Sequence, residues 1–203
     1  MRKIVFNVTI ISLILFFVQS CSIDENVTTT TAVSKSSTDY IGTYLSACGE
    51  NKQQAKVVIT DSGTEDAAYA NWYKISHSDS ACSTVIKTIQ YNHTASAMGD
   101  TTDDDGNSVS KIYLGTVNVT ATLNDTYTSN ANDGSWCGLS NWEEDTAKDV
   151  TGKDCTSSLS ETFSSALTQK YDIWHLNGTS FQKSEESTEG YATTLDGTVY
   201  TKQ

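Results

Sequence analysis

The residues of this chain that are best suited to bind a metal or to form covalent bonds are its five cysteines. They lie far apart, at Cys21, Cys48, Cys82, Cys137 and Cys155. A zinc site usually takes closely spaced cysteine and histidine ligands, such as a Cys-x-x-Cys pair, and the sequence contains no such pair. The spacing therefore favours disulfides over zinc, and we predict no metal and no cofactor.

The histidines and acidic residues form no recognisable catalytic motif. His77, Ser78 and Asp79 are the residue types of a hydrolase triad, but neighbours along a strand point to opposite faces and cannot assemble in that way. The acidic run at residues 143–145 has the residue types of a carboxylate pair, although such a run is more typical of a solvated loop. His175 fits a half-buried or surface position better than a ligand position. The sequence therefore predicts no enzymatic activity.

A second acidic segment, at residues 100–107, has some of the composition of a calcium loop. It reads DTTDDDGN. When Gly106 is aligned with the glycine of an EF-hand, Thr101 and Ile112 occupy positions that need carboxylates, so the EF-hand motif fails. An acidic solvated turn is the expectation, and a calcium site of another kind at the surface stays open.

Composition and charge narrow the class of protein. The chain has 203 residues, with 13 Lys+Arg against 25 Asp+Glu, and its net charge is −12. Nucleic acids and anionic lipid surfaces are bound by basic faces, so this balance argues against both as direct partners. Ten Tyr, four Trp and five Phe are enough to build a core, which argues against a disordered chain.

The N-terminus has the pattern of an export signal. Three residues with two basic side chains, Met1-Arg2-Lys3, precede a mostly apolar run from Ile4 to Val18. A membrane-spanning helix needs about 20 residues. The run is shorter than that and fits the apolar region of a secretory signal.

The residues that follow, Val18-Gln19-Ser20-Cys21, resemble the lipobox of bacterial lipoproteins. The resemblance implies cleavage before Cys21, lipidation of its thiol and acylation of its new amino group. Because Ser22 rather than Asp follows, it also implies sorting to the outer membrane. The expected organisation is a signal peptide at 1–20, a lipidated flexible tether at 21–38 and a β domain at 39–203. An ordinary signal peptide, giving a secreted or periplasmic protein, is the alternative.

Lipidation of Cys21 would leave an even set of four cysteines. Four cysteines allow three pairings. An exported protein meets an oxidising compartment, where disulfides form. We favour the two pairs that are local in sequence, Cys48–Cys82 and Cys137–Cys155.

The rest of the chain indicates strands. The segments expected to form them are 40–48, 54–61, 67–77, 82–93, 109–126, 169–176, 179–183 and 191–201. Residues 128–158 are expected to form a long irregular excursion, and 157–170 could hold a short helix because Leu159, Phe163 and Leu167 are spaced by four.

The longest predicted strand alternates between apolar and polar residues. Tyr113, Val117, Val119, Ala121 and Leu123 are expected to share a buried face. Thr116, Asn118, Thr120 and Thr122 are expected to share the wet face, as in an antiparallel sheet. Asp-Gly and Asn-Gly dipeptides at 105–106, 133–134, 177–178 and 196–197 are typical of hairpin turns.

Ile41-Gly42-Thr43-Tyr44 resembles the Gly-x-Trp start of lipocalin-like barrels, with Tyr44 in the place of Trp. The segment from Tyr73 to Cys82 is similar to a region of uncharacterised bacterial lipoproteins with lipocalin-like domains. The resemblance implies an all-β fold, an antiparallel lipocalin-like up-and-down barrel that can enclose one small ligand. A two-sheet β-sandwich is the alternative.

Two functions remain open at this point. The first is a lipid-anchored envelope protein that binds a small apolar or amphipathic ligand. Its aromatic residues would line the cavity or fill the core, and they are Tyr69, Trp72, Tyr73, Trp136, Trp142, Tyr171 and Trp174. The second is a non-catalytic structural or protein-interaction module with an exposed patch around Trp136 and Trp142.

Overall fold

The computed structural model of the chain describes residues 35–64, 66–155 and 161–203. The predicted signal peptide at 1–20, Cys21 and most of the predicted tether lie outside the described residues. Val33–Gln203 form one compact unit, to which all the strand pairings and both disulfides belong. Within the described residues, no helix is long and apolar enough to cross a membrane.

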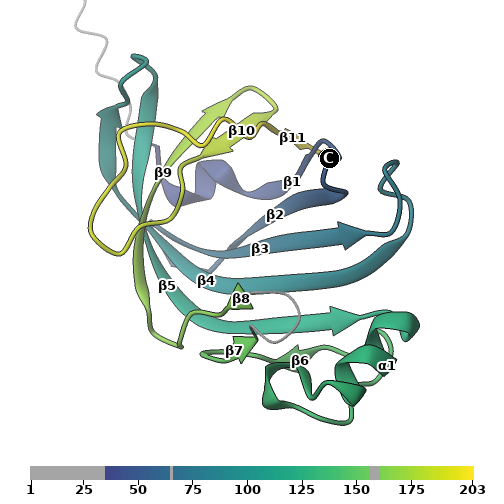
Figure 1. Cartoon of the computed structure of the whole chain (residues 1–203). Helices are drawn as coiled ribbons and strands as arrows, with labels where there is room; N and C mark the ends of the chain where they lie inside the picture. The colour runs from purple at the N-terminus through teal and green to yellow at the C-terminus, as the bar shows by residue number, and fades with distance from the viewer. Residues whose placement is uncertain (1–34, 65, 156–160) are drawn as a thin grey trace, which may run out of the picture. The chain divides into compact units, whose positions relative to one another are not determined.

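The unit is a closed antiparallel barrel of eight strands, as predicted for a lipocalin-like fold (Figure 1). Each strand pairs with the next, and the last pairs with the first, so the barrel closes. The strands are β1 (Gly42–Ser46), β2 (Gln53–Asp61), β3 (Ala67–His77), β4 (Val85–Thr102), β5 (Ser108–Leu123), β9 (Gln169–Asn177), β10 (Ser180–Lys183) and β11 (Tyr200–Lys202). This closure excludes the two-sheet sandwich.

Short elements complete the unit. A 3-10 helix, η1 (Ser37–Tyr40), precedes β1. The excursion between β5 and β9 contains α1 (Asp125–Asp133), the 3-10 helix η2 (Trp136–Gly138), and the short strands β6 (Lys148–Asp149), β7 (Asp154–Cys155) and β8 (Glu161–Thr162). β6 pairs with the second half of β5, beyond the part of β5 that pairs with β9.

Two predictions about the excursion are wrong. The segment 128–158 is not irregular throughout, because α1 begins where the side chain of Asn124 accepts a hydrogen bond from Tyr127 N–H. The helix was missed because it is mostly polar and buries only Thr128 and Ala131. The short helix expected within 157–170 does not form in the described residues 161–170, where β8 and β9 lie instead.

The strand boundaries differ most at β4 and β11. β4 begins at Val85 and continues to Thr102, well beyond the expected end at residue 93, because it pairs with β5 as far as Thr102. β11 is confined to Tyr200–Lys202, whereas 191–201 was expected. Asp-Gly at 105–106 and Asn-Gly at 177–178 form hairpin turns as predicted, but Asp133-Gly134 ends α1 instead.

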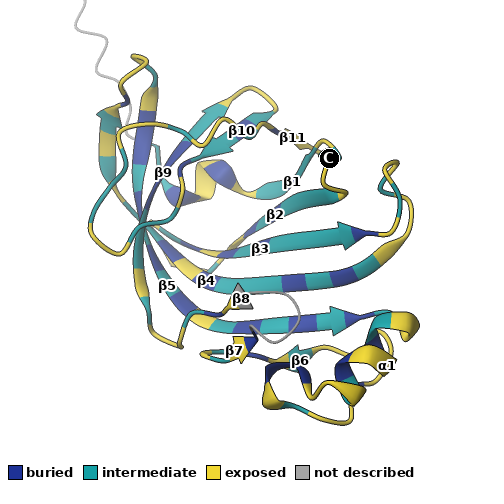
Figure 2. Cartoon of the chain, in the orientation of Figure 1, coloured by how far each residue is buried: buried dark blue, intermediate teal, exposed yellow. Residues whose placement is uncertain are grey.

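A β-bulge at Val117 changes which residues of β5 face the core. The register steps from Asn92–Asn118 to His93–Thr116, which leaves Val117 as the extra residue. Val119, Ala121 and Leu123 are buried as predicted, and dark bands alternate along β5 in Figure 2. On the N-terminal side of the bulge, the alternation of buried and exposed side chains is the reverse of the predicted one. Val117 is 50% exposed and Tyr113 is only half-buried, whereas Thr116 is buried, so these three assignments are wrong.

One end of the barrel interior is filled by an aromatic core. Its largest members are Tyr40, Tyr44, Trp72, Trp174, Phe181 and Tyr200. The rings of Trp72 and Phe181 are stacked with centroids 6.3 Å apart, and Trp174 meets both edge-on. Tyr44, at the position where the lipocalin pattern has Trp, is fully buried in this core. A continuous apolar cavity is therefore absent from this end.

A second core joins β4 and β5 to the excursion. It contains Ile89, Val119, Ala121, Leu123, Ala131, Trp136, Cys137, Trp142, Val150, Cys155 and Phe163. Trp136 and Trp142 are 2% and 3% exposed, and they pack against each other with centroids 5.1 Å apart. The exposed aromatic patch expected around these two residues does not exist.

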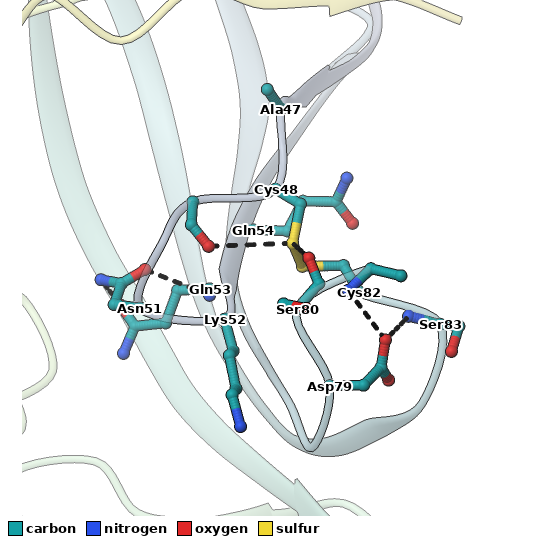
Figure 3. The surroundings of a disulfide bond; sticks show 12 residues. Ala47, Cys48, Asn51, Lys52, Gln53, Gln54, Asp79, Ser80, Cys82 and Ser83 are labelled. Carbon is teal, nitrogen blue, oxygen red and sulfur yellow. Dashed lines mark hydrogen bonds between the residues drawn. A yellow bond between two sulfur atoms is a disulfide. The ribbon is translucent and has the colours of Figure 1, made fainter.

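The two disulfides are those that the sequence favours. Cys48–Cys82 ties the β1–β2 connection to the β3–β4 connection, and Figure 3 shows its surroundings. Cys137–Cys155 links η2 to β7 inside the second core. Each closes a loop, of 34 and 18 residues, which restricts the unfolded chain and stabilises the fold by about 3–4 kcal/mol per disulfide in the loop-entropy model.

We predict that Phe181→Ala lowers the free energy of unfolding by about 3–5 kcal/mol, because it removes the ring that contacts most of the aromatic core. Val117→Ala, at the exposed bulge, should change it by less than about 0.5 kcal/mol. Urea unfolding of both variants would check the assignment of faces. Equal losses would contradict it.

Candidate functional site

A cavity of about 580 Å³ lies at the end of the barrel where β9 begins and β10 ends. That volume suits a small ligand. Its walls combine aromatic and charged side chains. The lining residues are Ala55, Trp72, Tyr73, Lys74, Tyr91, Thr162, Ser164, Lys170, Lys183, Glu185, Glu186 and Asp196.

Strand register explains why Trp72, Lys74 and Lys183 face inward. Trp72 on β3 lies opposite both Val57 on β2 and Tyr91 on β4. Side chains alternate along a strand, so Lys74, two residues after the buried Trp72, has the same inward parity. Lys183 at the end of β10 lies opposite Trp174, a member of the aromatic core. The cavity walls therefore continue the barrel interior beyond that core.

The charged side chains of the cavity are paired with one another. Lys170 Nζ donates to Glu186 Oε2 at 2.6 Å. Lys183 Nζ is 3.7 Å from Asp172 Oδ2, in the fully buried interior. His93 Nε2 lies 3.9 Å from Glu186 Oε1. Glu186 comes from the connection between β10 and β11, so these contacts hold that connection over the cavity.

Burial and neighbouring charges shift the pKa values of this cluster in different directions. Burial lowers the pKa of His93 to about 4, even though Glu186 opposes the shift, so His93 is neutral at pH 7. Burial also acts to lower the pKa of Lys183, but Asp172 and Glu186 outweigh it and raise that pKa. Burial acts to raise the pKa of Glu186, but Lys183, His93 and Lys170 outweigh it, and the pKa falls. Lys183 and Glu186 are therefore charged at pH 7.

A row of buried polar atoms beside the cavity lacks hydrogen-bond partners in the described part of the chain. The atoms are Trp72 Nε1 on β3, both ring nitrogens of His93 on β4 and Thr116 Oγ1 on β5. The rings of Trp72 and His93 are 6.3 Å apart, and His93 pairs with Thr116 across the sheet. A buried polar group without a partner costs about 1–3 kcal/mol, so a solvent or ligand molecule is expected at this row.

Of the aromatic residues singled out in the sequence, Trp72 and Tyr73 line the cavity. Trp174 belongs to the aromatic core, and Trp136 and Trp142 belong to the second core. Tyr69 is exposed, and Tyr171 packs against Tyr113 and Tyr191. Sequence reasoning missed Lys74, Lys170, Lys183, Glu186 and His93. The spacing of Lys74 from Trp72 was the available signal for one of them.

In the part of the chain that the structure describes, the residues of the catalytic and calcium hypotheses do not assemble into a site. His77 is buried on β3, whereas Asp79 lies in the following loop and accepts hydrogen bonds from Ala81, Ser83 and Thr84 N–H. Figure 3 shows the hydrogen bond from Ser83. The hydrogen bonds from Ser83 and Thr84 lower the pKa of Asp79 to about 2.

In the other acidic segment, Asp103 accepts from Asp105 N–H and from Asn107 N–H and Nδ2, which holds the turn between β4 and β5. The acidic run 143–145 is exposed. Among residues 35–64, 66–155 and 161–203, no three His, Cys, Asp or Glu residues gather as metal ligands.

His175, at the other end of β9, places Nδ1 2.9 Å from Ser108 O and is not part of the cavity.

No protein-family model matches the sequence, and a search of curated proteins finds no match either. The function is therefore inferred from the geometry and chemistry of the cavity.

We predict that His93 lowers the free energy of unfolding in mild acid, at pH values above those at which the carboxylates of the protein titrate. The unfolded histidine takes up its proton near pH 6.5 and the folded one only near pH 4, so acid favours the unfolded state. The shift corresponds to about 3 kcal/mol of stability lost progressively between pH 6.5 and pH 4.

The measurement is urea unfolding of the wild type and of His93→Gln at pH 7 and pH 5. The variant should lose less stability than the wild type over this interval, since glutamine does not titrate. The pKa of Glu186 is below its usual 4.5, so the stability that the ionised carboxylate contributes is lost only at lower pH. Parallel losses in the two proteins would show that His93 is not held neutral by burial.

Proposed function

We propose that this protein is a lipid-anchored lipoprotein of the cell envelope whose barrel binds a small amphipathic ligand. The lipobox resemblance at Val18–Cys21 supports the anchor, with Cys21 as the attachment site and the outer membrane as the location. Several acyl chains make a stable anchor, where one would be marginal. Residues 21 to about 36 would tether the barrel to that membrane.

One observation carries the binding function: a cavity of about 580 Å³ at one end of the barrel with both aromatic and charged walls. Trp72 and Tyr91 offer ring surface to the apolar part of a ligand. Lys170, Lys183 and Glu186 offer charged hydrogen-bonding groups to its polar part. Because the aromatic core fills the other end of the barrel, a ligand that is apolar throughout fits this site less well than an amphipathic one.

The alternative function, a structural or protein-interaction module, was based on an expected exposed aromatic patch. Trp136 and Trp142, expected to form an exposed patch, are buried in the second core. The ligand-binding function is therefore the one that the geometry of the described residues supports better.

We predict that Cys21→Ser abolishes incorporation of a labelled fatty acid and releases the protein from the membrane fraction. The paired substitution Cys48→Ser/Cys82→Ser is the matched control, since it removes cysteines but leaves Cys21, and it should remain labelled. Metabolic labelling followed by fractionation would measure both. Labelling that persists in Cys21→Ser would rule out this anchor.

We predict that residues 22–203, exported so that both disulfides form, carry a small molecule from the cell envelope. Native mass spectrometry should show extra mass that disappears on denaturation. Ala55→Leu, which places a larger side chain in the cavity, should remove it, while circular dichroism verifies the fold. An apo mass in the wild type, with no small molecule retained, would count against ligand binding and favour the structural role.

A further inference from the structure

Two lysines of the cavity keep hydrogen-bond donors that the protein does not use. An ammonium group carries several N–H donors and no acceptor. Lys170 Nζ uses one of them on Glu186 at 2.6 Å, and Lys183 Nζ uses one on Ser184 O at 2.8 Å. The indole N–H of Trp72, also a donor, has no partner. Further N–H groups of the two lysines therefore remain for a ligand.

Three acidic groups of the same region, Asp172, Glu186 and Asp196, already receive protein donors. Asp196 Oδ1 accepts from Thr198 N–H at 2.7 Å. Asp172 Oδ1 accepts from Ser184 N–H at 2.9 Å and from Ser184 Oγ at 2.7 Å. Asp172 Oδ2 accepts from Trp174 Nε1 at 2.9 Å. Glu186 Oε2 accepts from Lys170. A ligand that brings its own acceptors completes this set. A cationic ligand would have to compete for these three carboxylates, and among the described lining residues it would find only the Glu185 carboxylate without a protein donor.

The charge of the cavity also stands apart from that of the whole chain. The protein has only 13 Lys+Arg and a net charge of −12, yet three lysines, Lys74, Lys170 and Lys183, line this one cavity and balance its three carboxylates, Glu185, Glu186 and Asp196. Lys183 is 5.1 Å from the Trp72 ring centroid and Lys170 is 6.0 Å from that of Tyr91, so the ammonium groups lie beside the aromatic walls. A polar head and an apolar tail can therefore be bound next to each other.

We propose that the cavity binds an oxyanion, the carboxylate or phosphate head of an amphipathic ligand, through Lys170, Lys183 and the indole N–H of Trp72. The tail lies against Trp72 and Tyr91. This inference rests on the proposed function and specifies the ligand class for the same site. Charge-assisted hydrogen bonds from ammonium to oxyanion are among the strong ones in proteins.

The test compares amphiphiles that share one tail and differ in the head, each below the concentration at which it forms micelles. Dodecanoate and dodecyl phosphate carry oxyanions, dodecyltrimethylammonium is cationic and dodecyl maltoside is neutral. Calorimetric titration of residues 22–203 measures the dissociation constants. These residues contain the whole compact unit with its strand pairings and disulfides. The net negative charge of the protein favours the cation non-specifically, so a preference for the anions must come from the site.

We expect both anionic amphiphiles to bind at least about tenfold more tightly than the other two, since a hydrogen bond to a charged group contributes about 1.5–3 kcal/mol. Lys170→Gln should remove most of that preference. The double variant Lys170→Gln/Glu186→Gln keeps the local charge balance and should remove it without unfolding the protein. Trp72→Phe, which keeps the ring and deletes the N–H, should weaken dodecanoate several-fold. Lys111→Gln, on β5 outside the cavity, is the matched control and should bind like the wild type.

The outcomes separate this inference from the function on which it rests. If the neutral or cationic amphiphile binds as tightly as the anionic ones, the oxyanion site is wrong and amphiphile binding stands. If none of the four binds, both are overturned. An anionic preference that survives in the double variant would also overturn the assignment to Lys170.

Discussion

A fully buried carboxylate, Asp172, lies where the aromatic core of the barrel meets the cavity. Burial of a charge is unfavourable unless donors surround it, and four groups meet this requirement: Ser184 N–H, Ser184 Oγ, Trp174 Nε1 and, at 3.7 Å, Lys183 Nζ. The indole that it orients belongs to the aromatic core. The ammonium that it attracts lines the cavity. One interior carboxylate thus connects the filled end of the barrel to its polar end.

The division of the barrel into two ends follows from side-chain volume and strand register. A barrel of eight strands encloses little more space than its own side chains occupy, and the rings around Trp174 and Phe181 fill one end. At the end of the barrel near β9 and β10, long charged side chains replace the aromatic rings. Charged groups need contact with water or with a partner, so this end of the barrel is open. The bulge at Val117 adjusts β5 between these parts, since it turns Thr116 inward beside His93 and leaves Val119 to the second core.

The resemblance to lipocalin-like barrels implied the closed barrel. Alternation, turn dipeptides and local cysteine pairs, which are short-range signals, predicted most of the strands and both disulfides. Prediction from the sequence failed where contacts between distant parts of the chain determine the local structure. The inward parity of Tyr113 and Val117 was wrong because a single extra residue shifts the register, and α1 was missed because its polar sequence is stabilised by capping and by Ala131 against the second core. The cavity lysines looked like surface residues, since only closure of the barrel brings Lys74, Lys170 and Lys183 together.

If the charged and aromatic cavity of this barrel is a ligand site, a crystal structure of residues 22–203 grown with dodecanoate will contain the ligand there. We expect electron density for the carboxylate within hydrogen-bond distance of Lys170 or Lys183 and for the tail against Trp72 and Tyr91. An empty cavity closed by its own side chains, or dodecanoate bound only outside the barrel, would contradict this assignment.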